Sequence, residues 1–587
     1  MRKGKTLTPM SWGAMGLAGL VVVLIAWTLM ATPERQSGPM MVASADRRAS
    51  EAGLEMLEAG GSSVDAAIAV LAVLTLVEPQ SSGIGGGAYM LHWDKEANLL
   101  DTYDGRETAP ATIMPTAFLD ADGAPRPFRE IVPSGLSVGV PGSVAMLWLA
   151  HQEHGRLDWD QLFEPAIRLA EQGFAISPRL NEWIAWSPVL PRHENTRAYF
   201  FNENADGTVT PKEIGAVVRN PDYATTLRRI AEEGPDAFYR GPIAYDIVDA
   251  VRSSPFGAGG LSVEDMSSYT PIKRAALCQP YRSYRVCGMP PSSSGGLTSL
   301  QILGLLSHHD MSAVAPGSLE AVHLITEASR LAYADRDRYI GDTDFVDVPM
   351  AGMLAPDYLR RRSSAIDAAR SLGPAPVAAG ELAERQGAHF VPGKSVAQPS
   401  TSHFSIADGY GNVVSMTASV EAPFGSHIMA GGFFLNNQLT DFSFVPEIDG
   451  KPVANAIGPL KRPRSSMSPS IVFDQEGAFY AAIGSPGGSR IIAYVTKTLV
   501  ALLDWQMDMQ AAISLPHHVN RNGVLELEEG TGLEALIPEL EALGHEIKTR
   551  KLTSGLQGIR ATAQGFEGGA DPRREGVALG IGTHIAN

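Results

Sequence analysis

Two helical patterns open the globular part of the chain. Residues 45–59 repeat their apolar positions with helical spacing, and a Gly-Gly pair that begins at Gly60 ends the pattern. Residues 66–77 are apolar on nearly every side, yet this run is too short to span a membrane. A serine at 62 or 63 can cap this second helix, with Asp65 in its first turn. The pattern therefore predicts a helix buried at the centre of a layered domain.

A different pattern begins at Thr401. The stretch QPSTSHFSIADGYGNVVSMTASVE, residues 398–421, alternates apolar and polar positions around a turn at residues 408–411, which predicts a β-hairpin. The run before it, residues 373–400, carries Pro and Gly without an apolar period and is typical of a loop or linker. The strand thus starts abruptly, with hydroxyl and imidazole side chains from Thr401 to His403.

Helices and strands come from both sides of this linker. Residues 140–332 have a mostly helical pattern, whereas the chain after Thr401 is rich in strands and adds a helix over residues 490–503. This mixture predicts one sandwich built from both segments. Gly83 and Gly85 lie between a helix and a strand, which is the reverse of the order in a dinucleotide-binding loop. They therefore indicate closely packed backbone.

The composition narrows the classes of function. The chain has 587 residues, of which 44% are hydrophobic and 19% charged, as is typical of a globular protein. Its net charge of -17 disfavours nucleic-acid binding, because phosphate contacts need clustered Lys and Arg. Basic residues at Arg2, Lys3 and Lys5 precede an apolar run over residues 12–31 that is long enough to cross a bilayer. Residues 1–31 therefore predict export, with a signal peptide or a signal anchor.

The two cysteines, Cys278 and Cys287, flank a predicted hairpin. A two-residue turn at residues 282–283 places them directly opposite each other, with Pro280 at a position that needs no N–H group. They form either a disulfide, which an exported compartment favours, or two half-buried thiols. We predict no metal site, because no other Cys or close His completes a ligand set, and we expect no cofactor.

Thr401 carries chemistry that a strand does not need. Cleavage after Ser400 would give Thr401 an α-amino group with a pKa of about 8, which can take the proton of its hydroxyl. From the residues alone, a threonine at the start of a strand is more often an ordinary β-former or a local cap than a nucleophile. The turn SPGGSR, with Gly487 and Gly488, offers backbone N–H groups for an oxyanion hole, or it simply needs glycine dihedrals. No G-x-S-x-G elbow is present, so an α/β-type serine hydrolase lacks its nucleophile signature.

Two other motifs are polar without being specific. DGRETAP places Arg106 beside Glu107, which is either part of a site or a surface ion pair. KRPRSSMSP offers the hydroxyl groups of Ser465 and Ser466 next to Arg464, and such a stretch alone is more often plain loop.

The combination of these motifs resembles the gamma-glutamyltransferase (gamma-glutamyltranspeptidase) family. The similarity covers nearly everything from Pro39 to the C-terminus, including TSHFSIADGYG, KRPRSSMSPSIVF, GSPGGSRII, YDGRETAP and ADPRREGVALG. It implies an α+β fold of the N-terminal nucleophile hydrolase type, a four-layer αββα sandwich built from two subunits. The precursor would cleave itself between Ser400 and Thr401. The products would be a large subunit, residues 32–400, and a small catalytic subunit, residues 401–587, that stay together as a heterodimer.

The resemblance also implies a role for individual residues. One group performs the chemistry and the other holds the two ends of an amino-acid substrate, since burying a zwitterion requires paired charges. The chemical group is the nucleophile Thr401, Ser419 as its hydrogen-bonding support, and Gly487 and Gly488 as the oxyanion hole. The substrate's α-carboxylate would be held by Arg106, Ser465 and Ser466, and its α-amino group by Gln438 and Asp441.

This chain departs from the family pattern at two places. Glu421 stands where the family commonly has an asparagine that touches the nucleophile and the α-amino group. A carboxylate there can pair with an ammonium group, but it can also raise the pKa of the Thr401 amine. The segment over residues 441–465 is shorter than in members with a lid over the donor pocket, and it lacks the lid tyrosine. An open pocket favours hydrolysis and larger donors.

The resemblance implies a gamma-glutamyltransferase or hydrolase that acts on glutathione-like amides outside the cytoplasm, in the periplasm for example. A γ-glutamyl ester on Thr401 would form, and water or an amine acceptor would resolve it. One alternative is a glutaryl or cephalosporin acylase, against which Asp441 and Glu421 argue because a glutaryl group has no ammonium. A second alternative is an inactive, membrane-tethered binding protein, against which Thr401, Ser419 and the Gly487-Gly488 pair argue.

Overall fold

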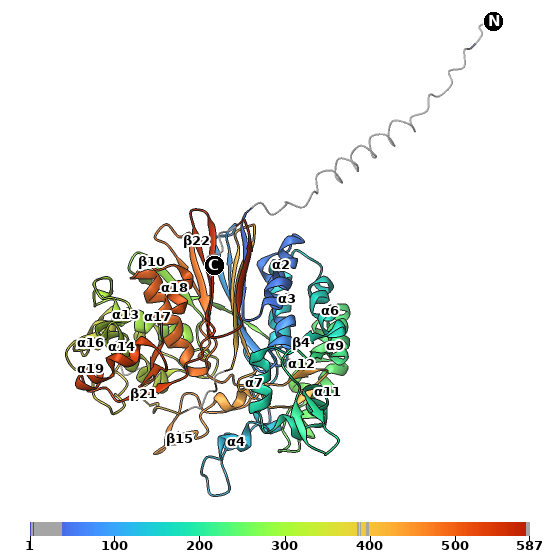
Figure 1. Ribbon diagram of the computed structural model, residues 1–587, viewed down its shortest axis with the longest axis horizontal. Helices are drawn as coiled ribbons and strands as arrows, with labels where there is room; N and C mark the ends of the chain where they lie inside the picture. The colour runs from blue at the N-terminus through green and yellow to red at the C-terminus, as the bar shows by residue number, and fades with distance from the viewer. Residues whose placement is uncertain are drawn as a thin grey trace. The chain divides into compact units, whose positions relative to one another are not determined.

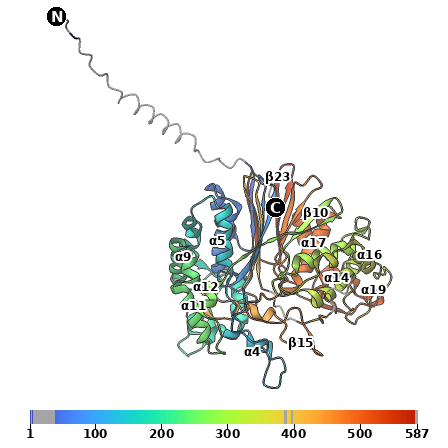
Figure 2. The same ribbon diagram turned by 180° about the vertical axis from the view of Figure 1, so that it is seen from behind.

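The computed structural model describes residues 38–383, 387, 389–394, 398 and 400–582, together with Met1 and Gly4. Apart from those two residues, the predicted signal or anchor segment at residues 1–31 lies outside this range. Within the described residues, no helix combines the length and apolarity that crossing a membrane requires. Figures 1 and 2 show the layered unit that begins at Gly38 from two opposite sides.

The first sheet has seven strands, which come from both sides of Thr401. Its centre is formed by β11 and β12, which lie between β1 and β2. The predicted hairpin is confirmed, since β11 pairs antiparallel with β12 and Ser402 lies opposite Ala418. In spatial order the strands are β24 (Val577–Ile581), β1 (Met40–Ser44), β11 (Ser402–Ala407), β12 (Val413–Ser419), β2 (Gly87–Asp94), β3 (Leu99–Gly105) and β8 (Ile272–Ala275).

The second sheet has six antiparallel strands and contains the cysteine hairpin. Cys278 pairs with Cys287 and Pro280 with Arg285, as the sequence predicts. Of the two alternatives for the cysteines, the structure contains the disulfide. In spatial order the strands are β23 (Gly565–Ala570), β22 (Gln557–Thr562), β18 (Phe479–Gly484), β17 (Ser470–Phe473), β10 (Tyr284–Gly288) and β9 (Leu277–Tyr281).

Each face of the first sheet packs into a different core. Met40 and Val42 of β1 point into the core shared with one set of helices. Met41 and Ala43 alternate with them and point into the core shared with the second sheet and the other helices. The two sheets therefore pack face to face and are covered by helices on their outer faces (Figure 1). The predicted α+β four-layer sandwich is confirmed.

Helix α3 (Ser63–Val77) is buried along its whole length, which confirms the predicted central helix. Ser62 and Asp65 close its N-terminus with a capping box. The other helices on its side are α2 (Arg47–Glu58), α5 (Ser143–His154), α6 (Glu164–Gln172), α7 (Pro178–Trp186), α9 (Pro221–Glu233) and α11 (Pro242–Arg252). Those against the second sheet are α13 (Gly295–Leu306), α14 (Leu319–Tyr339), α16 (Pro356–Ser363), α17 (Ile491–Leu503) and α18 (Met509–Ser514).

Short elements complete the unit, and most of them have no readable period in the sequence. Near the C-terminal end lie α19 (Ile537–Ala542) and β21 (Ile547–Arg550). The remaining short strands are β4 (Phe174–Ala175), β5 (Phe201–Glu203), β6 (Val209–Pro211), β7 (Val217–Val218), β13 (Met429–Ala430), β14 (Phe433–Phe434), β15 (Glu447–Ile448), β16 (Lys451–Pro452), β19 (His518–Asn520) and β20 (Leu525–Glu528). The remaining short α-helices are α4 (Phe128–Ile131), α8 (Glu194–Phe200), α10 (Pro235–Tyr239), α12 (Val263–Ser268) and α15 (Met350–Met353).

Gly85 and its neighbour Gly86 allow three backbone segments to meet beside the end of β12. A Cβ atom on Gly85 would lie 2.1 Å from the carbonyl oxygen of Phe434. On Gly86 it would lie 2.0 Å from the carbonyl oxygen of Ser419. These distances leave no room for a side chain, so the predicted close backbone packing is confirmed. The packing fixes the end of β12, where Ser419 lies.

Candidate active site

Thr401 lies immediately before β11 and is buried beside the end of β12. Because the two strands are antiparallel, Ser419 at the end of β12 is brought next to Thr401. The Thr401 Oγ1 and Ser419 Oγ atoms are 2.9 Å apart. The backbone of Thr401 has φ of 91°, which is unusual for a β-branched residue. The hydroxyl pair that the family resemblance implies is therefore formed in a buried, conformationally strained position.

The carbonyl group before Thr401 faces the predicted oxyanion turn. The N–H of Gly487 donates to the carbonyl oxygen of Ser400 at 3.3 Å. Gly487 and Gly488 have φ of 137° and 59°, so the turn between β18 and α17 requires glycine. On the other side, the Ser400 hydroxyl donates to the carbonyl oxygen of Gln80 at 2.5 Å. The bond between residues 400 and 401 is thus held beside a backbone donor.

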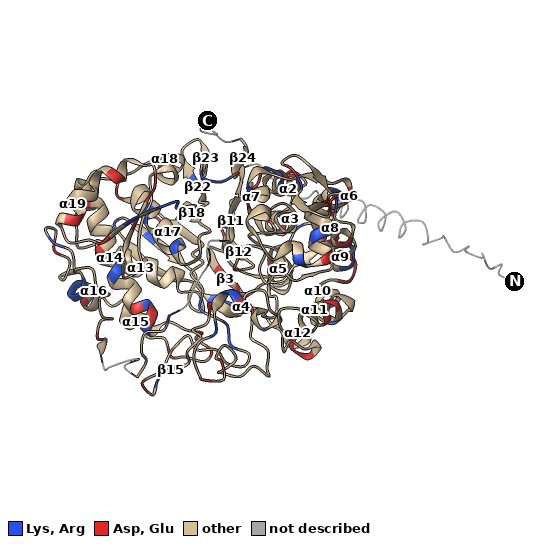
Figure 3. Ribbon diagram, turned by 60° about the horizontal axis from the view of Figure 1, so that its bottom comes forward, with Lys and Arg blue, Asp and Glu red and all other residues tan. Residues whose placement is uncertain are grey.

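A single pocket brings together every predicted site residue except Ser400 and Gly487. Figure 3 shows ribbon coloured for both signs of charge beside the labels of β3 and α4. Arg106 directly follows β3 in the sequence. Sequence reasoning did not identify Arg336, Arg464 or Gln398 as neighbours of Thr401. The pocket is lined by Arg106, Arg336, Gln398, Thr401, Ser419, Glu421, Gln438, Asp441, Arg464, Ser465, Ser466, Met467, Gly488 and Ile491.

Arg106 is a fully buried cation of this pocket. Its Nη2 atom lies 2.5 Å from Asp441 Oδ2, and Gln438 Nε2 donates to the same oxygen at 2.9 Å. Its Nη1 atom is 3.6 Å from Glu107 Oε2, and both side chains of that pair are fully buried. The alternative of a surface ion pair is therefore wrong. Burial opposes the charge of Arg106, but Asp441 raises its pKa above the ordinary value, whereas burial raises the pKa of Glu107 to about 8.

Glu421 lies between the nucleophile and the charged pair. Its backbone N–H donates to Ser419 Oγ at 2.9 Å. Its carboxylate accepts from Asn437 Nδ2 at 2.6 Å and from the backbone N–H of Gln398 at 3.0 Å. Burial, followed by the charge of Asp441, raises the pKa of Glu421 well above its ordinary value. One of its hydrogen bonds thus comes from the segment before Thr401.

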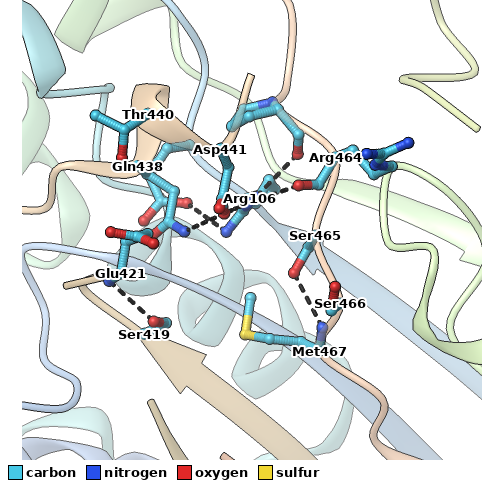
Figure 4. A network of polar contacts seen from close by, with 12 residues as sticks. Arg106, Ser419, Glu421, Gln438, Thr440, Asp441, Arg464, Ser465, Ser466 and Met467 are labelled. Carbon is cyan, nitrogen blue, oxygen red and sulfur yellow. Dashed lines mark hydrogen bonds and ion pairs between the residues drawn. The ribbon is translucent and has the colours of Figure 1, made fainter. Parts of the chain in front are cut away.

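Two serines form the opposite side of the pocket (Figure 4). Ser465 Oγ accepts from the N–H of Met467 at 3.1 Å, and Ser466 Oγ accepts from Arg336 Nη2 at 2.8 Å. Arg336 comes from α14, and burial lowers the pKa of Arg464 to about 9. The sequence contains no local signal for Arg336, because its partner lies 130 residues away. The pocket thus has hydroxyl groups and arginines facing carboxylates.

Two clusters among the described residues offer three candidate metal ligands each. The first consists of His323, Glu327 and His545, and the second of Asp101, Glu153 and His154. In the first, Arg330 lies 3.2 Å from the Glu327 carboxylate, and in the second Lys273 lies 2.8 Å from Asp101 and 2.6 Å from Glu153. Protein cations thus already pair with these carboxylates, and neither cluster includes residues of the pocket. The pocket itself is lined mainly by hydroxyl, amide and charged side chains.

Comparison with known proteins gives a consistent picture. Residues 49–581 match the family model described as gamma-glutamyltranspeptidase. The glutathione hydrolase proenzyme of Escherichia coli (strain K12) is 36% identical over 545 residues, covering 91% of this chain and 90% of that protein. The acylase ACY 1 proenzyme of Pseudomonas sp. (strain V22) is 32% identical over 558 residues, covering 93% of this chain and 94% of that protein. A cephalosporin acylase structure from Bacillus halodurans matches with a TM-score of 0.78 and 27% identity. The match covers 92% of this chain and 96% of that structure's chain.

Proposed function

Because this chain belongs to the gamma-glutamyltranspeptidase family, we propose that it cleaves itself before Thr401 and then transfers γ-glutamyl groups from glutathione-like amides. Water or an amine of an amino acid or peptide would accept the group. The observation that carries this proposal is the pocket in which Thr401 lies beside two groups of opposite charge. The proenzyme names of the relatives agree with a processed, two-subunit protein.

In the first reaction Thr401 Oγ1 attacks the carbonyl carbon of Ser400. The peptide C–N bond breaks, an ester forms, and the Thr401 nitrogen becomes a free amine. Water then hydrolyses the ester, which leaves a carboxylate on Ser400. The Gly487 N–H, which donates to the Ser400 oxygen at 3.3 Å, would stabilise the negative charge that develops on that oxygen.

In the second reaction the new α-amino group of Thr401 takes the proton of its own hydroxyl. The hydroxyl oxygen attacks the γ-carbonyl of the donor, and the amine of the donor leaves with a proton. The γ-glutamyl ester on Thr401 then reacts with water or an acceptor amine. Ser419, 2.9 Å from Thr401 Oγ1, would orient the nucleophile throughout.

The donor would be recognised through the two charged groups on its α-carbon, a carboxylate and an ammonium group. We assign its carboxylate to Arg106 and to the hydroxyl groups of Ser465 and Ser466. Its ammonium group would lie against Asp441, Gln438 and Glu421. An amino-acid end satisfies both sides of the pocket, whereas a glutaryl end brings no ammonium group to Asp441 and Glu421, so these carboxylates gain no opposite charge from the donor.

Anilide substrates test this assignment against the acylase alternative. We expect a kcat/KM for γ-glutamyl anilide about 10²–10⁴ times that for glutaryl anilide, because a site built around a polar group rejects an analogue that lacks it. The ratio is measured on one preparation with the same leaving group. Equal rates, or faster cleavage of glutaryl anilide, would identify an acylase instead.

Two subunits that stay together fit the sheet order. The small subunit would contribute β11 and β12 to the centre of the first sheet, with β1 and β2 of the large subunit on either side. Separation of residues 32–400 from residues 401–587 would therefore expose the core. We also propose export to an extracytoplasmic compartment through residues 1–31, with residues 12–31 as a tether if they are retained.

The pH dependence of stability tests the environment of Glu421. In the unfolded state of the uncleaved Thr401→Ala chain, the Glu421 carboxyl group loses its proton near its ordinary pKa of 4.5. In the folded state it loses that proton only at higher pH. The free energy of unfolding therefore falls as pH rises above that value. Adding Glu421→Gln removes this loss, so the Tm gain from the substitution should be larger at pH 8 than at pH 5, by about 2 °C.

Differential scanning calorimetry at the two pH values measures this gain. The exposed Glu447 provides the matched control, since Glu447→Gln should change the Tm equally at both. A Glu421→Gln gain that is the same at pH 5 and pH 8 would contradict the proposed burial of a proton.

A further inference from the structure

The backbone of Thr401 is held from two sides. A β-branched residue with φ of 91° is strained, and such a conformation persists only where its surroundings fix it. The carbonyl oxygen of Ser81 accepts the Thr401 N–H at 3.0 Å. On the other side, Arg574 Nη1 donates to the carbonyl oxygen of Thr401 at 3.1 Å. One contact is a backbone carbonyl and the other is a buried guanidinium group.

Arg574 is confined to this position. Its side chain is nearly buried, and its Nη2 atom donates to the carbonyl oxygen of Thr553 at 3.5 Å. Gly555 packs against it so closely that a Cβ there would lie 2.7 Å from Arg574 Cδ. Burial, followed by the charge of Arg179, lowers the pKa of Arg574 to about 9. The protein thus keeps a desolvated cation against the residue that becomes the nucleophile.

The other charges around Thr401 do not replace this cation. Near Arg574, Glu78 and Arg179 pair with each other. The Arg179 Nε atom lies 3.4 Å from Glu78 Oε1. The nearby Asp571 carboxylate lies 3.1 Å from Arg573 and accepts from Ser554 and Leu556. On the pocket side the charged groups are Glu421, Asp441, Glu107, Arg106, Arg336 and Arg464.

We propose that Arg574 is a positioning residue for Thr401, which holds its strained backbone for self-cleavage and favours the neutral form of its new α-amino group. The proposal rests on the proposed function, in which Thr401 is the nucleophile. The carbonyl and the amine belong to the same residue, so the guanidinium group lies within about 5–6 Å of the amine. A cation at that distance disfavours an ammonium group, while Glu421 and Asp441 favour it. Arg574 thereby offsets the carboxylates of the pocket.

Two variants separate the hydrogen bond from the charge. Arg574→Met removes both, so self-cleavage should slow more than tenfold, and the acid limb of kcat/KM against pH in the cleaved fraction should move up by about one pH unit. Arg574→Lys keeps the charge but loses the fork of two donors. Its cleavage should also slow, while its acid limb should stay within about 0.3 pH units of the unsubstituted enzyme.

Self-cleavage is followed on denaturing gels after the protein is diluted into fresh buffer. Activity is measured with γ-glutamyl anilide as the substrate. Arg560→Met is the control, because Arg560 pairs with Glu567 on the second sheet and contacts no pocket residue among those described. An Arg574→Met enzyme with an unchanged acid limb would overturn the proposal, even if its Tm falls, because a purely structural role does not move that limb. Should Arg574→Met fail to fold, Arg574→Lys decides, and cleavage at the unsubstituted rate overturns the proposal.

These outcomes are distinct from failure of the proposed function. If the unsubstituted protein stays a single chain and turns over no γ-glutamyl anilide, the proposed function is wrong. If it cleaves and turns over substrate while the Arg574 variants match it, only the role of Arg574 is wrong.

Discussion

Thr401→Ala is expected to leave one intact chain without measurable γ-glutamyl transfer. Without Oγ1 no group can attack the Ser400 carbonyl carbon, although the Gly487 N–H still lies beside that oxygen. The unsubstituted protein should give two chains on a denaturing gel, which mass spectrometry assigns to a cut between residues 400 and 401. The loss of activity should be at least about 10⁴-fold, as expected for removal of a covalent nucleophile.

Two neighbouring substitutions make this result specific. Thr401→Ser retains a hydroxyl and should still cleave, more slowly because the strained backbone is less restricted without the β-branch. Ser402→Ala alters the next buried hydroxyl without touching the Thr401–Ser419 pair and should cleave normally. A purified Thr401→Ala protein that still separates into two chains at the same bond would refute the assignment of the nucleophile.

Local patterns were sufficient to predict much of the fold. The uniform apolarity of residues 66–77 predicts burial, and the structure places those residues in α3, which is buried throughout. The alternation after Thr401 predicts the hairpin of β11 and β12. Counting from a separate turn at residues 282–283 gives the correct opposition of Cys278 and Cys287. Such predictions succeed because helix and strand periods are local properties. The order of strands in each sheet is not local, since β1 and β24 are neighbours from opposite ends of the chain.

The residues of the site likewise include some that local sequence motifs predict and others that they do not. Motifs supplied the residues that the family resemblance assigns, such as Ser465 and Gly488. Arg336 and Arg574 were missed, because Arg336 lies 130 residues from its partner Ser466 and Arg574 lies 173 residues from its partner Thr401. The sequence could not exclude a surface ion pair between Arg106 and Glu107, because their burial depends on which segments pack over the end of the strand. Charge in a sequence therefore indicates a candidate, while its environment decides its chemistry.

Glu421 illustrates this distinction. Sequence reasoning identifies it as a departure from the family pattern but leaves its ionisation open. The structure surrounds its carboxylate with Asn437 and the N–H of Gln398, while burial, followed by the charge of Asp441, raises its pKa. In our proposal Gln398 belongs to the large subunit and loses its covalent connection to Thr401 on cleavage. Cleavage would therefore free one oxygen of Glu421 for the ammonium group of a donor.

Asp441→Asn is expected to have the second largest effect, and to act on specificity. The carboxylate of Asp441 accepts from Arg106 and Gln438, and we assign it to the donor's ammonium group. Replacing it by an amide removes the negative charge but keeps the shape. The kcat/KM for γ-glutamyl anilide should fall about 10²–10³-fold, the usual consequence of losing one partner of a buried charge pair. Glutaryl anilide, which carries no ammonium, should lose at most about threefold.

The ratio of the two kcat/KM values therefore separates donor recognition from general damage. Asp337 provides the matched control, because its carboxylate contacts Arg336 at 2.8 Å and Arg464 at 3.3 Å without lining the pocket. Asp337→Asn should lower both rates by a similar factor, since it alters the arginines behind Ser466 and not the ammonium side. If Asp441→Asn also lowered both rates equally, Asp441 would act by holding Arg106 in place, and another group would bind the ammonium.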